Sequence, residues 1–261
     1  MALVSIVTIV KNHGEGLTRT LESVKQQEFL DWEMLIVVGQ SIDDTHEIGH
    51  RMAMADPRIK IINQDGTGIY AAMNLGLNNL ESKYTWFLNA GDQFFSPLSL
   101  GQGVDAIRLS KVGLVVGGYK VANVSRSKVH IFREKELRVF QFSFNRHGGC
   151  HQAMIFDTSA VKSIGGFDLQ YDLASDFDLV LRIIKISKAK RIAVALALIE
   201  PGGVADSNLN KVFLEKHIIR KSIKAGVLMR LCSCVWTCMA RSRKRLRDSK
   251  FLVRRLLARQ I

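Results

Sequence analysis

Two patterns of apolar residues alternate along the first third of the chain. Short runs of mostly β-branched residues, which favour strands, alternate with stretches whose apolar positions recur every three or four residues, which favour helices. The strand-like runs are 3–10, 33–38, 59–62 and 84–88, and the helix-like stretches are 17–24, 43–54 and 69–77. Because these strands are apolar throughout, they predict a parallel sheet that helices cover on both faces.

The pattern is less regular after residue 100. It predicts strands at 113–118, 150–156 and 192–199, a helix at 176–186 with Leu179, Ile183 and Ile186 on its inner face, and a hairpin or exposed excursion between 119 and 144. In open α/β sheets, ligands bind beyond the carboxyl ends of the strands. We therefore expect a site among the loops after residues 10, 38, 62 and 88.

Length and composition are those of an ordinary globular protein. The chain has 261 residues, 47% apolar and 23% charged, which suits one large domain with a sizeable core. Its four cysteines are too few for a disulfide framework and favour a reducing compartment. No apolar run reaches the ~18 residues of a membrane-spanning helix. The apolar start lacks basic residues before it, so we expect a buried strand rather than a signal peptide, and a cytoplasmic protein.

The net charge of +13 lies in one segment. Residues 1–210 contain 22 Lys and Arg against 22 Asp and Glu. Residues 211–261 contain 15 basic and two acidic residues, so 15 − 2 accounts for the whole excess. This segregation predicts a neutral body at 1–210 and a basic, amphipathic, helical tail at 211–261.

The tail combines a cationic face with an aliphatic face. On a helix, the leucine and valine side chains between 252 and 257 would lie opposite Arg247, Lys250 and Arg254. This pattern predicts peripheral attachment to an anionic membrane, the inner face of the plasma membrane; the alternatives are a solvated helical pair packed on the body or a partner-binding segment. Aliphatic rather than aromatic neighbours argue against nucleic acid. The cysteines at 232, 234 and 238 lack a second pair or a histidine, which argues against zinc.

Residues suited to chemistry follow the predicted strands. Asn12 can bind the edge of a nucleobase or belong to an ordinary polar turn. The glycines at 66 and 68 permit a tight turn, and Thr67 can cap the next helix, whose N-terminus attracts anions such as a diphosphate. Asp92 can bind a hard divalent cation or be a turn aspartate.

Two aspartates open the predicted helix at 176–186. Asp176 and Asp178 are two residues apart, so they do not share a helix face, and at most one should point into a site. Asp176, at the helix start, is the better candidate for a general base. Its alternative role is that of a helix N-cap.

The order of these segments carries a resemblance. The segments are VSIVTIVKN (4–12), SIDDT (41–45), GIYAAMNLGL (68–77), FLNAGD (87–92), CHQAMIF (150–156), GGFD (165–168), ASDFDLVLRI (174–183) and PGGV (201–204). Together they resemble family 2 glycosyltransferases with the GT-A, nucleotide-diphospho-sugar transferase fold, most closely the colanic-acid and exopolysaccharide type. The resemblance covers residues 2–210 and implies an α/β fold with a Rossmann-like mixed sheet flanked by helices.

The resemblance implies a nucleotide-diphospho-sugar donor, with UDP or GDP as the nucleotide. Thr8, Val10 and Asn12 would line the pocket of the base, and Asp65 would help to read it. The segment from Gly68 to Asn74 would flank the nucleotide-sugar.

The resemblance also implies the reacting groups. Asp92, together with Asn89, would hold Mn²⁺ or Mg²⁺ on the diphosphate. His151 and Gln152 would face the donor sugar or the acceptor, which we expect to be a polyprenyl-diphosphate-linked glycan of surface polysaccharide biosynthesis. Asp176 would deprotonate the acceptor hydroxyl for a single displacement, which inverts the anomeric configuration.

Several positions depart from the family pattern. Val38 and Gly39 stand where many relatives carry an acidic pair, and the segment 89–92 holds one acid where two or three are usual. Ser175 replaces an acid before the base, Ala71 replaces a common Asp, and Asp65 sits one place early. These losses leave a second hypothesis open: a catalytically degenerate, membrane-associated subunit of the same fold that binds donor or a partner without turnover.

Overall fold

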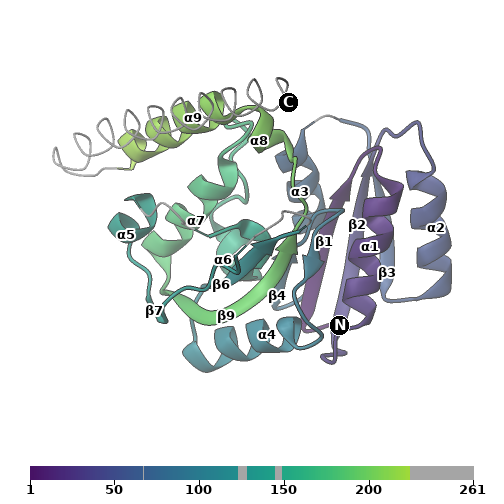
Figure 1. Cartoon of the computed structure of the whole chain (residues 1–261), viewed down its shortest axis with the longest axis horizontal. Coiled ribbons are helices and arrows are strands. Elements are labelled where there is room, and N and C mark those ends of the chain that lie inside the picture. Colours follow the sequence, from purple (N-terminus) through teal and green to yellow (C-terminus); the bar gives the residue numbers. More distant parts are fainter. Residues whose placement is uncertain (67, 123–127, 145–148, 224–261) are drawn as a thin grey trace, which may run out of the picture. The chain divides into compact units, whose positions relative to one another are not determined.

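The computed structural model describes residues 1–66, 68–122, 128–144 and 149–223 (Figure 1). The chain divides into two compact units, residues 1–203 and residues 204–261. The predicted boundary after residue 210 lies a few residues beyond this division and stays a prediction. The described part of the second unit consists of α8 (Val204–Ser207) and α9 (Leu209–Ser222).

The first unit is built on one mixed sheet. Its described strands are β1 (Val4–Val10), β2 (Trp32–Gly39), β3 (Ile59–Gln64), β4 (Tyr84–Phe87), β5 (Gln93–Phe94), β6 (Leu114–Val121), β7 (Lys135–Glu136), β8 (Met154–Asp157) and β9 (Ala189–Ile199). The order is β3-β2-β1-β4-β8-β6-β9-β5, with β7 paired to β9. The first four strands are parallel to one another, as predicted, whereas β8 runs antiparallel to both β4 and β6.

Helices cover both faces of this sheet. They are α1 (Gly14–Lys25), α2 (Thr45–Ala55), α3 (Ile69–Asn78), α4 (Ser99–Ser110), α5 (Val139–Phe144), α6 (Thr158–Ser163) and α7 (Ser175–Ile186). On one face, alternate residues of β1 share a core cluster with apolar residues of α1, α2 and α4. On the other, α3 lies so close to β1 that a Cβ on Gly76 would be 2.5 Å from Val7. Burial on both sides explains the unbroken apolar character of these strands.

The register brings the ends of the parallel strands level. Val10 pairs with Val38, and Gly39 pairs with Gln64, so β1, β2 and β3 end at the same edge. Beyond β4, the backbone N–H of Ala90 still donates to the carbonyl of Ile9 at 3.2 Å. The turn that follows β4 therefore starts beside the end of β1, where a ligand site was expected.

Two predictions need correction. The segment 150–156 is not one strand: His151–Ala153 form a 3₁₀ turn, and only β8 follows. Ile186 is not on the inner face of α7, since it is 56% exposed at the last residue of that helix. The sequence reading also missed α4 and the two-residue β5. The irregular region between 119 and 144 contains β7 and α5 and an antiparallel bridge of Tyr119 to His130 in its described part.

Candidate active site

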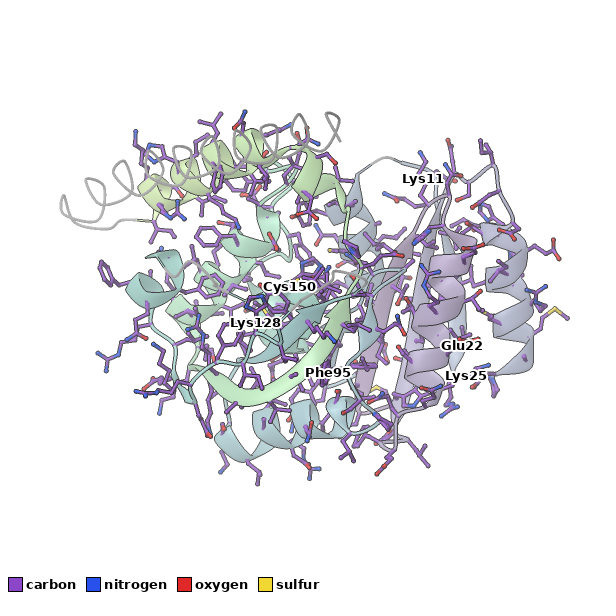
Figure 2. All side chains as sticks on the ribbon, viewed as in Figure 1. Lys11, Glu22, Lys25, Phe95, Lys128 and Cys150 are labelled. Carbon is purple, nitrogen blue, oxygen red and sulfur yellow. The ribbon has the colours of Figure 1, made fainter. Side chains whose placement is uncertain are left out.

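The loops after β1 and β2 are tied together at the carboxyl edge of the sheet. Asn12 adopts a positive φ of 50°, which asparagine tolerates better than most residues. Its backbone N–H donates to Ser41 Oγ at 3.0 Å, and its Oδ1 accepts from the backbone N–H of Ile42 at 2.8 Å. Lys11, labelled in Figure 2, lies in the same loop. Asn12 thus sets the shape of this edge, where a nucleobase pocket was predicted.

Hydrogen bonds to α1 and one within the turn hold residues 89–92 in place. The backbone N–H of Gly91 donates to the carbonyl of Gly16 at 3.1 Å and to Thr20 Oγ1 at 2.9 Å, both in α1. The N–H of Asp92 closes the turn on the carbonyl of Asn89 at 3.0 Å. Gly91 has a φ of +94°, a conformation that glycine adopts without strain. The turn therefore presents Asn89 and Asp92 in fixed positions.

Asp92 is a buried carboxylate with a partner on each oxygen. It is 5% exposed, and its Oδ2 accepts from Gln152 Nε2 at 2.8 Å while its Oδ1 accepts from the backbone N–H of Glu200 at 2.9 Å. Burial raises the pKa of Asp92 to about 6, and the nearby Glu200 carboxylate adds to the rise, although these hydrogen bonds and His151 oppose it. The carboxylate lacks enough positive charge around it to offset its loss of water.

His151 connects the turn to the start of α7. Its Nε2 lies 3.3 Å from Asn89 Nδ2, and its Nδ1 lies 3.3 Å from Asp176 Oδ2. Both contacts are satisfied together when Nδ1 carries the proton, because Nε2 then accepts from the asparagine amide and Nδ1 donates to the carboxylate. The hydroxyl of Tyr70, at the start of α3, lies 3.3 Å from Asp176 Oδ1. Asp176 is thus aimed by an imidazole and a phenol, and its side chain is 28% exposed.

The structure brings five predicted residues into one arrangement. Asn89 and Asp92 belong to one turn, His151 and Gln152 are consecutive, and Asp176 lies in the first turn of α7. His151 contacts Asn89 and Asp176, while Gln152 contacts Asp92. The predicted base and the predicted metal ligand are therefore bridged by two neighbouring residues of one turn.

Asp178 does not take part in this arrangement. Its Oδ2 accepts from Arg182 Nε at 2.5 Å on another side of α7. Burial raises the pKa of Asp178, although Arg182 opposes the rise. Asp176 and Asp178 thus have different partners, and the expectation that at most one of them points into a site stays a prediction.

Other predicted residues have structural partners or lie at the edge. Thr8 is fully buried, and its Oγ1 donates to the carbonyl of Leu88 at 2.7 Å. Asn74 uses both ends of its amide on the backbone of Phe167, at 2.8 Å each. Val10 is buried at the end of β1, whereas Asp65 and Gly68 are exposed after β3. Their predicted contacts with the donor stay predictions, and Thr67, the predicted cap, lies outside the described residues.

The sequence did not point to His13, Arg19 or Glu200, nor to the contact between Tyr70 and Asp176. Tyr70 contacts Asp176, and Glu200 supplies a backbone donor to Asp92. The side chain of Glu200 in turn accepts hydrogen bonds from His13 and Arg19. Position in the sequence could have suggested both Glu200 and His13. Glu200 comes directly after β9, and His13 lies in the loop after β1. Their partnership could not be read from the sequence because the two positions are 187 residues apart.

The turn that carries Asp92 also presents a side-chain oxygen that accepts no hydrogen bond in the described part of the chain, that of Asn89. Asn89 Oδ1 is buried and has no hydrogen-bond partner in the described part of the chain. A carboxylate and an amide oxygen are ligands that Mg²⁺ and Mn²⁺ accept, usually with water and phosphate oxygens completing the shell. Within residues 1–66, 68–122, 128–144 and 149–223, no three His, Cys, Asp or Glu side chains gather in a metal-binding group. The protein's own contribution to a cation there would be small.

Comparison with proteins of known sequence places this site in context. An uncharacterized glycosyltransferase of Mycobacterium tuberculosis is 30% identical over 213 residues, 77% of this chain and 76% of that one. A PGL/p-HBAD biosynthesis glycosyltransferase of Mycobacterium bovis is 26% identical over 223 residues, 81% of this chain and 82% of that one. These relatives are mycobacterial, so the narrower resemblance to the colanic-acid and exopolysaccharide type stays a prediction.

Solved structures share the fold. Residues 1–349 of S. aureus TarS in complex with UDP match with a TM-score of 0.69 at 16% identity, covering 87% of this chain and 67% of that one. This chain spans 41% of the longer TarS chain. The mannosyltransferase PcManGT from Pyrobaculum calidifontis, in complex with GDP-Man and Mn²⁺, matches with a TM-score of 0.63 at 14% identity, covering 86% and 65%. The predicted GT-A fold is confirmed. Residues 5–165 match the family Glycosyl transferase family 2, and the chain belongs to this family.

Proposed function

We propose that this chain is an inverting, metal-assisted transferase that moves a sugar from a UDP- or GDP-sugar to a hydroxyl of a polyprenyl-diphosphate-linked glycan. One observation supports this proposal most: Asp176 and Asp92 converge through the consecutive residues His151 and Gln152. A transferase needs a base on one side of the anomeric carbon and charge compensation for the leaving diphosphate on the other. The two carboxylates provide the two ends of such an arrangement.

Asp176 is the proposed base. It accepts the proton of the acceptor hydroxyl while the acceptor oxygen bonds to the anomeric carbon and the bond to the diphosphate breaks. Because attack and departure occur on opposite sides, the configuration inverts. His151 and Tyr70 hold the two oxygens of this carboxylate, and its partial exposure lets an acceptor reach it.

Asp92 and Asn89 are the proposed metal-binding residues. A divalent cation would neutralise charge that develops on the departing nucleoside diphosphate. The buried Asp92 carboxylate and the unpaired Asn89 Oδ1 fit a cation, because both lack sufficient positive charge or donors around them. Support also comes from the similar fold of PcManGT, whose structure contains GDP-Man and Mn²⁺. TarS structures with UDP and UDP-GlcNAc support a nucleotide-sugar donor in the same way.

The acceptor and location rest on the tail. Residues 224–261, which carry most of the predicted amphipathic segment, lie outside the described residues. In the described part of the chain, no helix is long and apolar enough to cross a bilayer. A basic tail on the inner face of the plasma membrane would bring the site to a lipid-linked acceptor of surface polysaccharide biosynthesis.

Nucleotide-binding calorimetry and one variant test this proposal. We expect UDP or GDP to bind the wild type more tightly with Mn²⁺ than with EDTA. We expect Asp176→Asn to bind that nucleotide normally and to lower kcat for sugar transfer about a thousandfold, the usual scale of general-base catalysis. Asp105→Asn, which removes an exposed carboxylate from α4, is the matched control and should keep wild-type turnover. Wild-type turnover in Asp176→Asn would exclude this base, and a chain that binds neither nucleotide would support the non-catalytic alternative.

A further inference from the structure

Glu200 joins three segments at the end of β9. Its backbone N–H donates to Asp92 Oδ1 at 2.9 Å. Its side chain accepts from His13 Nε2 at 2.7 Å and from Arg19 Nη2 at 2.5 Å. His13 precedes α1 and Arg19 lies in its second turn, so one residue connects β9, α1 and the Asp92 turn.

Two glycines make room for this contact. A Cβ on Gly91 would lie 1.8 Å from Glu200 Oε2 and 3.1 Å from His13 Nε2. A Cβ on Gly16 would lie 2.1 Å from the ring of His13. The carboxylate and the imidazole therefore occupy the space that side chains at positions 91 and 16 would need. Since the N–H of Gly91 also donates to the carbonyl of Gly16, the four residues form one packed unit next to Asp92.

Stability alone does not account for this unit. The side chains of His13, Arg19 and Glu200 are 39%, 38% and 32% exposed, and ion pairs of such exposure contribute about 0–1 kcal/mol to folding. Their position has a more specific effect, because the backbone they anchor donates to Asp92. Residues that fix the partners of a ligating carboxylate typically change metal affinity about 10- to 100-fold when removed.

We infer that Glu200, held by His13 and Arg19, is a positioning residue that fixes the Asp92 carboxylate for a cation–diphosphate ligand. This inference rests on the proposed function for the identity of that ligand. The N–H of Glu200 on Oδ1 and the amide of Gln152 on Oδ2 together set the plane of the carboxylate. One lone pair then remains on each oxygen in a fixed plane, and a cation meets a preorganised ligand.

UDP affinity in Mn²⁺ and in EDTA, measured by calorimetry, separates positioning from a general structural role. We expect Glu200→Ala to weaken UDP binding about tenfold in Mn²⁺ and to leave binding in EDTA unchanged. Glu200→Gln, which can still accept from Arg19, should stay within about threefold of the wild type. Glu15→Gln is the matched control, because Glu15 also contacts Arg19, at 3.9 Å, but is 93% exposed and should have no effect. Equal affinity of Glu200→Ala and wild type in Mn²⁺ would overturn the inference, as would equal weakening in Mn²⁺ and EDTA or a Gln variant as weak as the Ala variant.

Hydrogen exchange of the metal-free protein tests the same inference without any ligand. The backbone amide of residue 200 should exchange about tenfold faster in Glu200→Ala and in Arg19→Met than in the wild type and Glu15→Gln, because its bond to Asp92 Oδ1 loses its anchor. Unchanged exchange would overturn the positioning role. A wild type that binds no nucleotide with Mn²⁺, but shows this exchange pattern, would contradict the proposed function and leave the positioning role supported.

Discussion

Asp92 shows how a single buried carboxylate can lower stability. Its carboxylate is almost fully removed from water, and the compensation it receives is two neutral hydrogen bonds. The raised pKa of about 6 means that the folded protein holds a proton on Asp92 more tightly than the unfolded chain does. Between about pH 4 and pH 6 the native state therefore binds more protons, and stability falls as pH rises through this window.

Replacing Asp92 with Asn should stabilise the metal-free protein at neutral pH. The amide keeps the shape and carries no buried charge: its oxygen can accept from the N–H of Glu200, and its Nδ2 can donate to Gln152 Oε1 once the Gln152 amide turns over. We expect the free energy of unfolding at pH 7 to rise by about 1–3 kcal/mol, and the difference from wild type to vanish near pH 4. Urea unfolding in EDTA at several pH values measures this. The same variant should lose Mn²⁺-dependent UDP binding, so a less stable variant at pH 7 would contradict this account of Asp92.

Gly91 offers a second prediction at the same scale. A methyl group at this position must displace the Glu200 carboxylate, which is 1.8 Å from the Cβ site, and must adopt a φ of +94°. We expect Gly91→Ala to lower the free energy of unfolding by about 1–3 kcal/mol and to weaken Mn²⁺-dependent UDP binding.

Gly101→Ala is the control for this substitution. Its Cβ would lie 3.6 Å from Phe29, an ordinary contact, within α4. Because alanine favours a helix interior, this variant should gain about 0.5–1 kcal/mol. Thermal unfolding of both variants compares the signs, and a Gly91→Ala protein as stable as wild type would refute the crowding argument.

Motif residues of the site were predictable, and their supporting partners were not. Asp92 and Asp176 could be chosen because each follows or precedes a recognisable element, whereas the pair at 151–152 was implied by the resemblance of its segment to the family. Glu200 and Tyr70 act through contacts with residues more than a hundred positions away. Such contacts depend on strand order, and β9 reaches Asp92 only because it pairs with β5, a strand too short to recognise in the sequence.

At the scale of elements, the turn at 164–167 fixes α3 relative to α7. Asn74 of α3 binds the backbone of Phe167, and Tyr70 stacks on the Phe167 ring with centroids 5.3 Å apart. Arg182 of α7 donates to the carbonyls of Ile164 and Gly166 at 2.8 and 2.7 Å. These contacts of Asn74, Phe167 and Arg182, which we call the 164–167 frame, set the distance between Tyr70 on α3 and Asp176 on α7.

Removing Arg182 should loosen this frame. Arg182→Met leaves two carbonyls and the buried Asp178 carboxylate without their donor, and breaking such a pair typically costs about 3–5 kcal/mol. We expect a loss of that size in chemical denaturation. The double variant Asp178→Asn with Arg182→Met should recover part of the loss, because no buried charge is then unpaired. A double variant that is less stable than Arg182→Met would contradict this explanation.

Elements with strong apolar periodicity were predicted well, whereas α4 shows why others were not. Its sequence, SLGQGVDAIRLS, contains two glycines, which disfavour a helix. The structure supplies the reason for one of them: a Cβ on Gly103 would lie 2.5 Å from the Trp86 ring. Close packing on β4 therefore outweighs local propensity. In the segment 150–156, polar side chains at 151 and 152 turn toward the site, and the backbone forms a 3₁₀ turn rather than a strand.

At the scale of the whole molecule, charge and chemistry are separated. Residues 1–210 have no net charge, whereas residues 211–261 carry the full +13. A uniformly basic protein would bind many polyanions through its entire surface, but a neutral catalytic body with a basic tail can be held at an anionic membrane by the tail alone. Each basic residue near such a surface contributes about 1 kcal/mol, and this attraction is screened by salt.

This separation predicts how the full chain binds vesicles. Replacing Arg241, Arg243, Lys244, Arg245 and Arg247 with Gln removes five positive charges from the tail, and at about 1 kcal/mol each it should lower affinity for anionic vesicles at least a hundredfold. The matched control removes five exposed charges from the body: Lys25, Arg51, Lys83, Arg108 and Lys111. Cosedimentation with anionic and with zwitterionic vesicles, at low and high salt, measures the difference.

If both variants pellet equally, or if lipid charge makes no difference, the tail is not an electrostatic membrane anchor. A solvated or partner-binding helix then explains its sequence better. Loss confined to the tail variant would mean that the neutral body, with Asp176 and Asp92, works at the membrane because fifteen basic residues outside it bring it there.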